Sequence, residues 1–123
     1  MVTMLSEYFS RDELKCKCGC NKIGGFPDML NRVIICLEKL TELAGRKPVI
    51  TSAYRCIKHN AAVKGKIRSY HLVDMACDLY IGGMTNKKIS NLARQAGFTG
   101  TIRYAKMGFV HCDLGPKYDR DEP

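Results

Sequence analysis

The chain has 123 residues, of which 46% are hydrophobic and 26% charged, and its formal net charge is +8 at pH 7. That length is enough for one hydrophobic core, so we expect a single domain over residues 1–123 and exclude a catalytic domain joined to a second folded wall-binding module. The positive charge favours anionic partners, although the basic residues are scattered in a way that a solubilising surface explains equally well.

The first third of the chain predicts two helices separated by a loop. A short helix is expected from Phe9 to Leu14 with Ser10 as its N-cap, and the cysteine- and glycine-rich segment up to Gly25 is expected to be a loop. Pro27 opens the longest helix and Gly45 ends it. Apolar residues recur along this helix at helical spacing and are expected to pack on a sheet: Leu30, Val33, Ile34, Leu37, Leu40 and Leu43.

The middle of the chain predicts a short strand at residues 48–51 and a weaker helix at about residues 56–63. The apolar run over residues 75–81 is typical of a buried strand. Successive side chains on a strand point to opposite faces, so Asp78 is expected on the opposite face from Cys77.

Toward the C-terminal end, Thr85 is a suitable N-cap for another helix, and Gly97 fits its end. Residues 101–104 and 109–114 are expected to form a hairpin. The polar tail at residues 117–123 is expected to fray. These elements predict an α+β fold in which helices cover one face of a small, mainly antiparallel sheet.

Two histidines and one aspartate lie in apolar runs, where a charge is costly unless it is paired or bound to a metal. Asp78 and His111 lie on the two buried strands, and His71 precedes the first of them. If these strands are neighbours, Asp78 and His111 can meet across the ladder. Each group alone is more often structural, but two imidazoles and one carboxylate together suit zinc and leave a fourth position for water. We therefore predict a Zn²⁺ site on the sheet face opposite the helices.

The same residues resemble a known family. Ser69-x-His71, Ala76-x-Asp78 and Phe109-Val-His111-x-Asp113-x-Gly115 are similar to motifs of the M15 zinc peptidases. That family includes D-alanyl-D-alanine carboxypeptidases, murein endopeptidases and phage endolysins, and its fold is shared with the Hedgehog signalling domain. The likeness covers nearly the whole chain, because further segments resemble other blocks of the family: Phe9 to Cys20, Val49 to Arg55, and His59-Asn60 with Gly65.

The resemblance implies zinc-dependent hydrolysis of peptide bonds in bacterial peptidoglycan, by a D,D-carboxypeptidase or an endopeptidase. It implies that Arg55 stabilises the oxyanion or holds a substrate carboxylate, because a guanidinium offers paired donors of matching geometry. Ser69 either binds substrate or hydrogen-bonds its own loop. Asp113 either acts as the base or fixes the tautomer of a ligand histidine, and we favour the latter role.

The chain departs from the family at two positions. Asp74 and Ala53 stand where glycine is usual. Asp74 could crowd the substrate, bind metal or lie in a turn, and we favour a tolerated turn residue. Several branches carry an acid or a histidine where this chain has Gly108 and Phe109, so no general base is assigned. The alternative function is a non-catalytic, zinc-stabilised binding domain on the same fold.

The expected compartment and partners follow from what the sequence lacks. Residues 1–10 have no apolar core of a signal peptide, and no apolar run is long enough to span a membrane. We expect a chain that is cytoplasmic on synthesis, with no membrane insertion, and that reaches the cell wall by phage-type lysis. The basic segment at residues 64–68 has no interleaved aromatic residues, which argues against a nucleic-acid partner. The oligomeric state is not predicted.

Seven cysteines are many for this length, and in the cytosol they should stay reduced. Cys36, Cys77 and Cys112 fall within apolar patterns and are expected in the core. The Cys-x-Cys-x-Cys motif at Cys16, Cys18 and Cys20 is interpreted mainly as a structural loop. A metal clip is the lesser interpretation, because no other cysteine or histidine follows at zinc-finger spacing.

Overall fold

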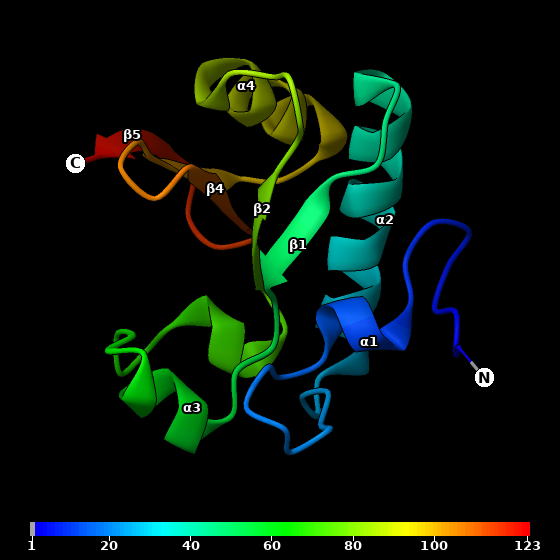
Figure 1. Cartoon of the computed structure of the whole chain (residues 1–123), viewed down its shortest axis with the longest axis vertical. Helices are drawn as coiled ribbons and strands as arrows, with labels where there is room; N and C mark the ends of the chain where they lie inside the picture. The colour runs from blue at the N-terminus through cyan, green and yellow to red at the C-terminus, as the bar shows by residue number, and fades with distance from the viewer. Residues whose placement is uncertain (1) are drawn as a thin grey trace.

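The computed structural model describes residues 2–123 (Figure 1). Within these residues the helices are α1 (Arg11–Leu14), α2 (Pro27–Ala44), α3 (Ile57–Ala62) and α4 (Asn86–Ala96), and a 3-10 turn, η1, covers Tyr70–Val73. The strands are β1 (Val49–Ser52), β2 (Ala76–Tyr80), β3 (Gly100–Tyr104), β4 (Phe109–Asp113) and β5 (Tyr118–Glu122). These five described strands form one sheet in the order β1-β2-β4-β3-β5, antiparallel except where β5 joins β3. The predicted α+β class is confirmed.

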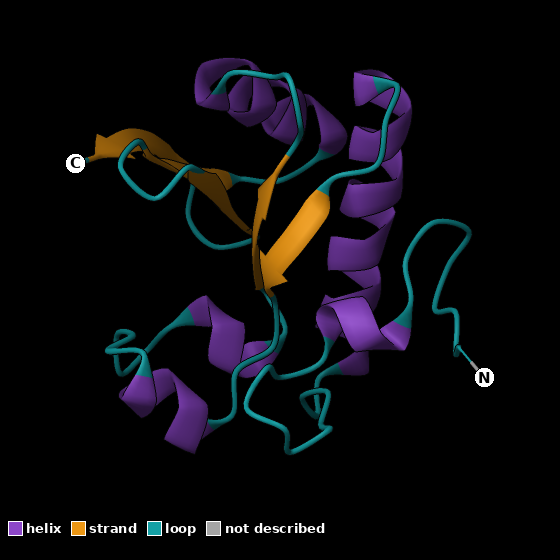
Figure 2. Ribbon diagram, viewed as in Figure 1, coloured by secondary structure: helices purple, strands orange, loops and turns teal. Residues whose placement is uncertain are grey.

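The hydrophobic core lies between one face of the sheet and helices α2 and α4, which pack against each other (Figure 2). Leu37 and Leu40 of α2 share this core with Ile89 of α4 and Leu79 of β2. The three cysteines that were expected in the core are buried in it: Cys36, Cys77 and Cys112. None of the helices in the described part of the chain could span a bilayer, because none is both long and apolar enough.

The two N-terminal helices begin and end where their sequences predict. Ser10 caps α1, and its side chain and that of Glu13 form a reciprocal capping box. Pro27 starts α2, and Gly45 ends it in the left-handed conformation. The expected apolar stripe is correct except at its last position, because Leu43 is 44% exposed and the partly buried Ala44 packs against the core instead.

The strand pattern places the polar candidates as predicted. Asp78 of β2 is the register partner of His111 of β4, and Cys77 is the partner of Cys112. The two cysteines face the core, so Asp78 and His111 occupy the opposite face of the sheet. This pairing of two strands is what allows residues 33 positions apart in the sequence to meet.

The polar tail is not frayed, and that prediction was wrong. Tyr118–Glu122 forms β5, which pairs in parallel with β3 at the edge of the sheet. Its acidic residues are matched by arginines: Asp119 lies 2.6 Å from Arg103 and 2.7 Å from Arg94, and Asp121 lies 2.6 Å from Arg103. The segment is polar because it is an edge strand that faces solvent and pairs with charged side chains, and this polarity led to the prediction of fraying.

Candidate metal centre

Three side chains converge on the sheet face opposite the core. His71 Nε2 lies 3.2 Å from Asp78 Oδ1, and His111 Nδ1 lies 2.9 Å from the same oxygen. One donor atom from each residue lies within 4.8 Å of the other two. His71 and Asp78 are buried and His111 is partly buried. The structure thus brings together all three predicted ligands, which we call the His–Asp triad.

His71 is held by its own turn and by the end of β1. It lies on η1, whose first backbone groups are capped by Ser69, and the Ser69 hydroxyl accepts from the His71 N–H at 3.2 Å. The His71 Nδ1 lies 2.6 Å from the carbonyl oxygen of Ala53. A carbonyl can only accept, so Nδ1 carries a proton and donates it to Ala53, and Nε2 is the ring nitrogen that faces Asp78. The contact of Ser69 is the loop hydrogen bond, one of the two roles considered for it.

A buried carboxylate contacts the ring nitrogen of His111 that faces away from Asp78. The His111 Nε2 lies 2.8 Å from Asp113 Oδ2, and Asp113 is fully buried. The same carboxylate accepts from the Tyr118 hydroxyl at 2.6 Å and from the Gly115 N–H at 3.0 Å. Asp113 is therefore engaged on the side of the ring away from Asp78. This geometry supports the tautomer-fixing role and speaks against Asp113 as a base acting on a water at the triad.

Asp78 and His111 have shifted proton affinities. Burial raises the pKa of Asp78, but hydrogen bonds from His111 and His71 outweigh it and hold that pKa below its ordinary value. Burial lowers the pKa of His111, but hydrogen bonds to Asp113 and Asp78 outweigh it and raise the pKa to about 9. In the metal-free protein, His111 is thus an imidazolium between two carboxylates. A divalent cation binding at Nδ1 must displace that proton.

Arg55 contacts the triad directly. Its NH2 group lies 3.2 Å from Asp78 Oδ2, the oxygen that does not face the histidines. Its Nε donates to Ser52 at 3.1 Å and its NH1 donates to the Asn60 side chain at 3.3 Å. Asn60 packs closely on Gly65, where a Cβ would overlap the amide oxygen of Asn60. The guanidinium is therefore fixed on three sides, and the glycine leaves room for the residue that holds it.

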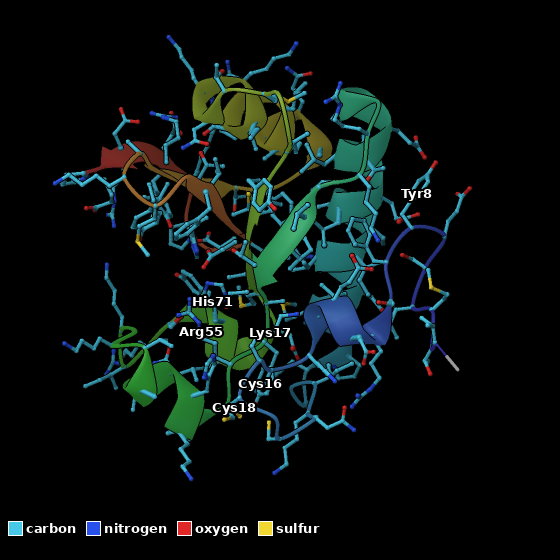
Figure 3. All side chains as sticks on the ribbon, viewed as in Figure 1. Tyr8, Cys16, Lys17, Cys18, Arg55 and His71 are labelled. Carbon is cyan, nitrogen blue, oxygen red and sulfur yellow. The ribbon has the colours of Figure 1, made fainter. Side chains whose placement is uncertain are left out.

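A cleft opens beside Asp78 on the exposed side of the sheet. Its walls include Arg55, Tyr80, Met107 and Phe109, and the buried Asp78 also lines it. Figure 3 shows Arg55 and His71 close to each other between the sheet and α3. Arg55 is thus bound to a triad residue and also open to a ligand in the cleft.

Asp74 does not point toward the triad. Its carboxylate accepts from the Phe26 N–H at 3.2 Å and is 3% exposed. Asp74 ends η1 with φ 60°, a left-handed conformation that favours glycine and, after it, asparagine and aspartate. Burial raises the pKa of this carboxyl. Of the three roles considered for Asp74, the structure supports a place in a turn.

Sequence reasoning missed several contacts of the site. The Ala53 carbonyl carries no side-chain signal, and Tyr118 lies in the segment that was expected to fray. Asn60 stood out only through the resemblance, which gave it no contact. Cys56 was overlooked as well, although it lies with three other cysteines in a second group of candidate ligands.

Comparison with known proteins adds one finding. A family model described as Peptidase M15 matches residues 7–113. The matched range contains the whole His–Asp triad together with Arg55 and Asp113, and it ends before β5. No curated protein matches the chain.

Proposed function

The chain belongs to the peptidase M15 family, and from that premise we propose that it hydrolyses peptide bonds of bacterial peptidoglycan with a zinc ion held by the His–Asp triad. Members of the family are metal-dependent peptidases, so a metallopeptidase acting on a peptide substrate follows from membership alone. Zinc as the ion and peptidoglycan as the substrate are the finer parts of the proposal. The observation that carries the metal is the convergence of His71, Asp78 and His111 beside a cleft, and peptidoglycan follows from the resemblance to wall peptidases.

The donor set fits zinc. Zn–N and Zn–O bonds of about 2.0–2.1 Å place neighbouring ligand atoms of a tetrahedral site about 3.3–3.4 Å apart. The histidine nitrogens lie 3.2 Å and 2.9 Å from Asp78 Oδ1, so small outward movements would admit the ion. The outer ring nitrogens of both histidines are already bound to oxygen acceptors. Two imidazoles and one carboxylate with an open fourth position form the donor set of a hydrolytic zinc.

Each protein group then has a defined task. A bound zinc supplies a Lewis acid for the scissile carbonyl and lowers the pKa of a bound water to ~7. With an ion bound, Ala53 and Asp113 would accept from the outer ring nitrogens of His71 and His111, and the inner nitrogens would be the ones that hold the ion. Arg55 holds Oδ2 of Asp78, which leaves Oδ1 facing the position of the ion.

Arg55 also has donors left for a substrate. A guanidinium has five N–H groups. Three are used by Ser52, Asn60 and Asp78, so two remain. Because Arg55 lines the cleft, these two N–H groups can bind either a substrate carboxylate or the oxyanion that forms at the attacked carbonyl.

The net charge of +8 supports a substrate within an anionic polymer. A basic surface is attracted to the acidic polymers of a bacterial wall and would hold the enzyme near its substrate. We propose the endolysin role on this basis, in which the protein acts on the wall after a separate protein permeabilises the membrane. Addition of the purified protein to intact and to permeabilised bacteria tests this role, because lysis should require access to the wall.

The proposal is tested with zinc-loaded protein and intact peptidoglycan, with the released fragments identified by mass spectrometry. Release of single D-alanine would indicate a carboxypeptidase, and cleavage within the stem peptides or their cross-links an endopeptidase. His111→Ala should abolish release and lower the zinc content, whereas His59→Ala, which changes the one histidine outside the triad, should leave both unchanged. A zinc-bound wild type that leaves every peptidoglycan type intact would overturn the proposal.

A second candidate is the non-catalytic binding domain. It is favoured by one observation: among the described residues that line the cleft, Asp78 is the only carboxylate, and it belongs to the triad. No other acid there could act as a general base. On this reading the zinc-loaded protein would co-sediment with peptidoglycan and release no fragments.

A further inference from the structure

Four cysteine sulfurs gather where the N-terminal loop meets the start of α3. Donor sulfurs of Cys16, Cys18, Cys20 and Cys56 all lie within 4.8 Å of one another. The Sγ of Cys18 lies 3.5 Å from that of Cys16 and 3.7 Å from that of Cys56. Each of these cysteines is free of a disulfide within the described residues. Figure 3 shows Cys16 and Cys18 beside the segment that leads to α3, next to Arg55.

The sulfur spacing matches one tetrahedral metal ion. A Zn–S bond of about 2.3 Å places neighbouring sulfurs about 3.8 Å apart. The two sulfur–sulfur distances above, 3.5 Å and 3.7 Å, are close to that value. A disulfide requires about 2.05 Å and joins only two atoms, so it would not account for four sulfurs converging on one point.

Backbone N–H groups already point at two of the four sulfurs. The Cys56 N–H donates to the Cys16 sulfur at 3.4 Å, and the His59 N–H donates to the Cys56 sulfur at 3.3 Å. Backbone N–H groups that point at sulfur stabilise its negative charge. Four thiolates around a divalent ion leave a net charge of −2, and two lysines, Lys15 and Lys17, adjoin ligand cysteines in the sequence.

We propose that Cys16, Cys18, Cys20 and Cys56 bind a second zinc ion. Soft thiolate ligands in a tetrahedral arrangement select zinc over the hard divalent ions. Four protein ligands leave no position for water, so this site is structural and takes no part in hydrolysis. It is independent of the proposed function, because none of its ligands belongs to the His–Asp triad.

The second zinc has a clear structural task, since it joins the loop at residues 16–20 to the residue that follows Arg55. The same region is tied down by backbone bonds, from the Tyr54 N–H to Leu14 at 3.2 Å and from the Arg55 N–H to His71 at 3.0 Å. The ion would add a link that fixes the start of α3. It would thereby keep the Arg55 guanidinium in place beside Asp78.

Metal stoichiometry tests the proposal. Elemental analysis of protein purified under reducing conditions should find two zinc ions per chain in the wild type and one in Cys56→Ser. Cys36→Ala removes a core thiol outside the cluster and should retain two. His111→Ala should retain the thiolate-bound ion and lose the other, so each substitution should empty only one of the two sites. One zinc per chain in the wild type, unchanged in Cys56→Ser, would overturn the second site, as would a disulfide among the four cysteines.

Cobalt provides a readout that does not depend on a folded variant. Co²⁺ bound by thiolates gives an intense ligand-to-metal charge-transfer absorption, which histidine and carboxylate ligands do not give. The cobalt-loaded wild type should show this band, His111→Ala should keep it, and Cys18→Ser should weaken or lose it. A cobalt-loaded wild type without the band would overturn the proposal even if every cysteine variant failed to fold.

Discussion

His111 Nε2 lies 2.8 Å from Oδ2 of Asp113, the residue two positions further along β4, and that carboxylate is fully buried. Residues two apart on a strand share a face, so the strand itself sets this contact. Because the other ring nitrogen faces Asp78, the ring bridges two carboxylates. A substitution at Asp113 should therefore alter metal binding indirectly, by changing the orientation or protonation of the His111 imidazole.

Asp113→Asn should weaken zinc binding by about 10–100-fold, the usual effect of removing a group that orients a metal-bound histidine. An amide has one acceptor oxygen, whereas Asp113 accepts from His111, Tyr118 and Gly115. Titration against a chromophoric chelator would measure the affinity. Asp12→Asn, at an exposed carboxylate, is the matched control. Equal zinc affinity in wild type and Asp113→Asn would contradict the orienting role.

Zinc affinity should rise with pH up to about 9. The pKa of His111 is raised to about 9 in the metal-free protein, so below that pH a proton competes with the metal for Nδ1. The apparent dissociation constant should fall by roughly tenfold for each pH unit gained while one proton is displaced. Calorimetry in buffers of different ionisation enthalpy would count the released proton. A dissociation constant that is flat across this range would show that His111 is already neutral.

The stability of the metal-free protein should show the opposite trend. A histidine whose pKa is raised on folding contributes stability that is complete below its unfolded pKa of about 6.5 and is lost as the pH passes the folded value. For His111 that window extends from about 6.5 to about 9. Urea unfolding of chelator-treated protein should therefore show a decreasing free energy of unfolding across the window. His111→Ala should lack this slope.

Asp74 should matter for folding and not for the metal. Asp74→Gly keeps the left-handed backbone but loses the bond to the Phe26 N–H, at a cost of about 1 kcal/mol. Asp74→Asn keeps an acceptor and removes a buried charge, so it should raise the free energy of unfolding at neutral pH. Denaturant titration would measure both. Zinc content and peptidoglycan hydrolysis should match the wild type in Asp74→Asn, and a loss of either would place the carboxylate in the site.

Arg55→Lys should lower hydrolysis by roughly 10²-fold, the scale of losing one donor to a developing oxyanion. A lysine ammonium has no planar fork and cannot serve Ser52, Asn60 and Asp78 together while binding a substrate. The rate of fragment release from peptidoglycan is the measurement. Arg46→Lys, at an exposed arginine bound to the Gly82 carbonyl, is the control. An unchanged rate in Arg55→Lys would leave Arg55 with only a structural role.

The meeting of Asp78 and His111 could be predicted because strand parity and one pairing assumption are enough to place both. The helix limits could also be predicted, since Ser10, Pro27 and Gly45 act through local backbone chemistry. The helix limits are short-range signals, because each depends only on neighbouring residues.

The features that escaped prediction depend on partners distant in the sequence. The sequence of β5 has the composition of a polar tail, and only the fold places Arg103 of β3 beside Asp119 and Asp121. Cys56 lies 38 residues from Cys18, and short zinc-finger spacings do not reach that far. Subtracting the three core cysteines from the seven would have left Cys56 with the loop cysteines, but only the fold brings their sulfurs together.

The two triad histidines differ in how strongly substitutions at other positions should disturb them. His71 is held by the main-chain carbonyl of Ala53, a group that every residue at that position supplies. His111 relies on the Asp113 side chain and, through it, on the Tyr118 hydroxyl. In a library of random single substitutions, loss-of-function variants should therefore be more frequent at Asp113 and Tyr118, which support His111, than at position 53. Position 53 should drift between small residues such as glycine and alanine without disturbing the ring it supports.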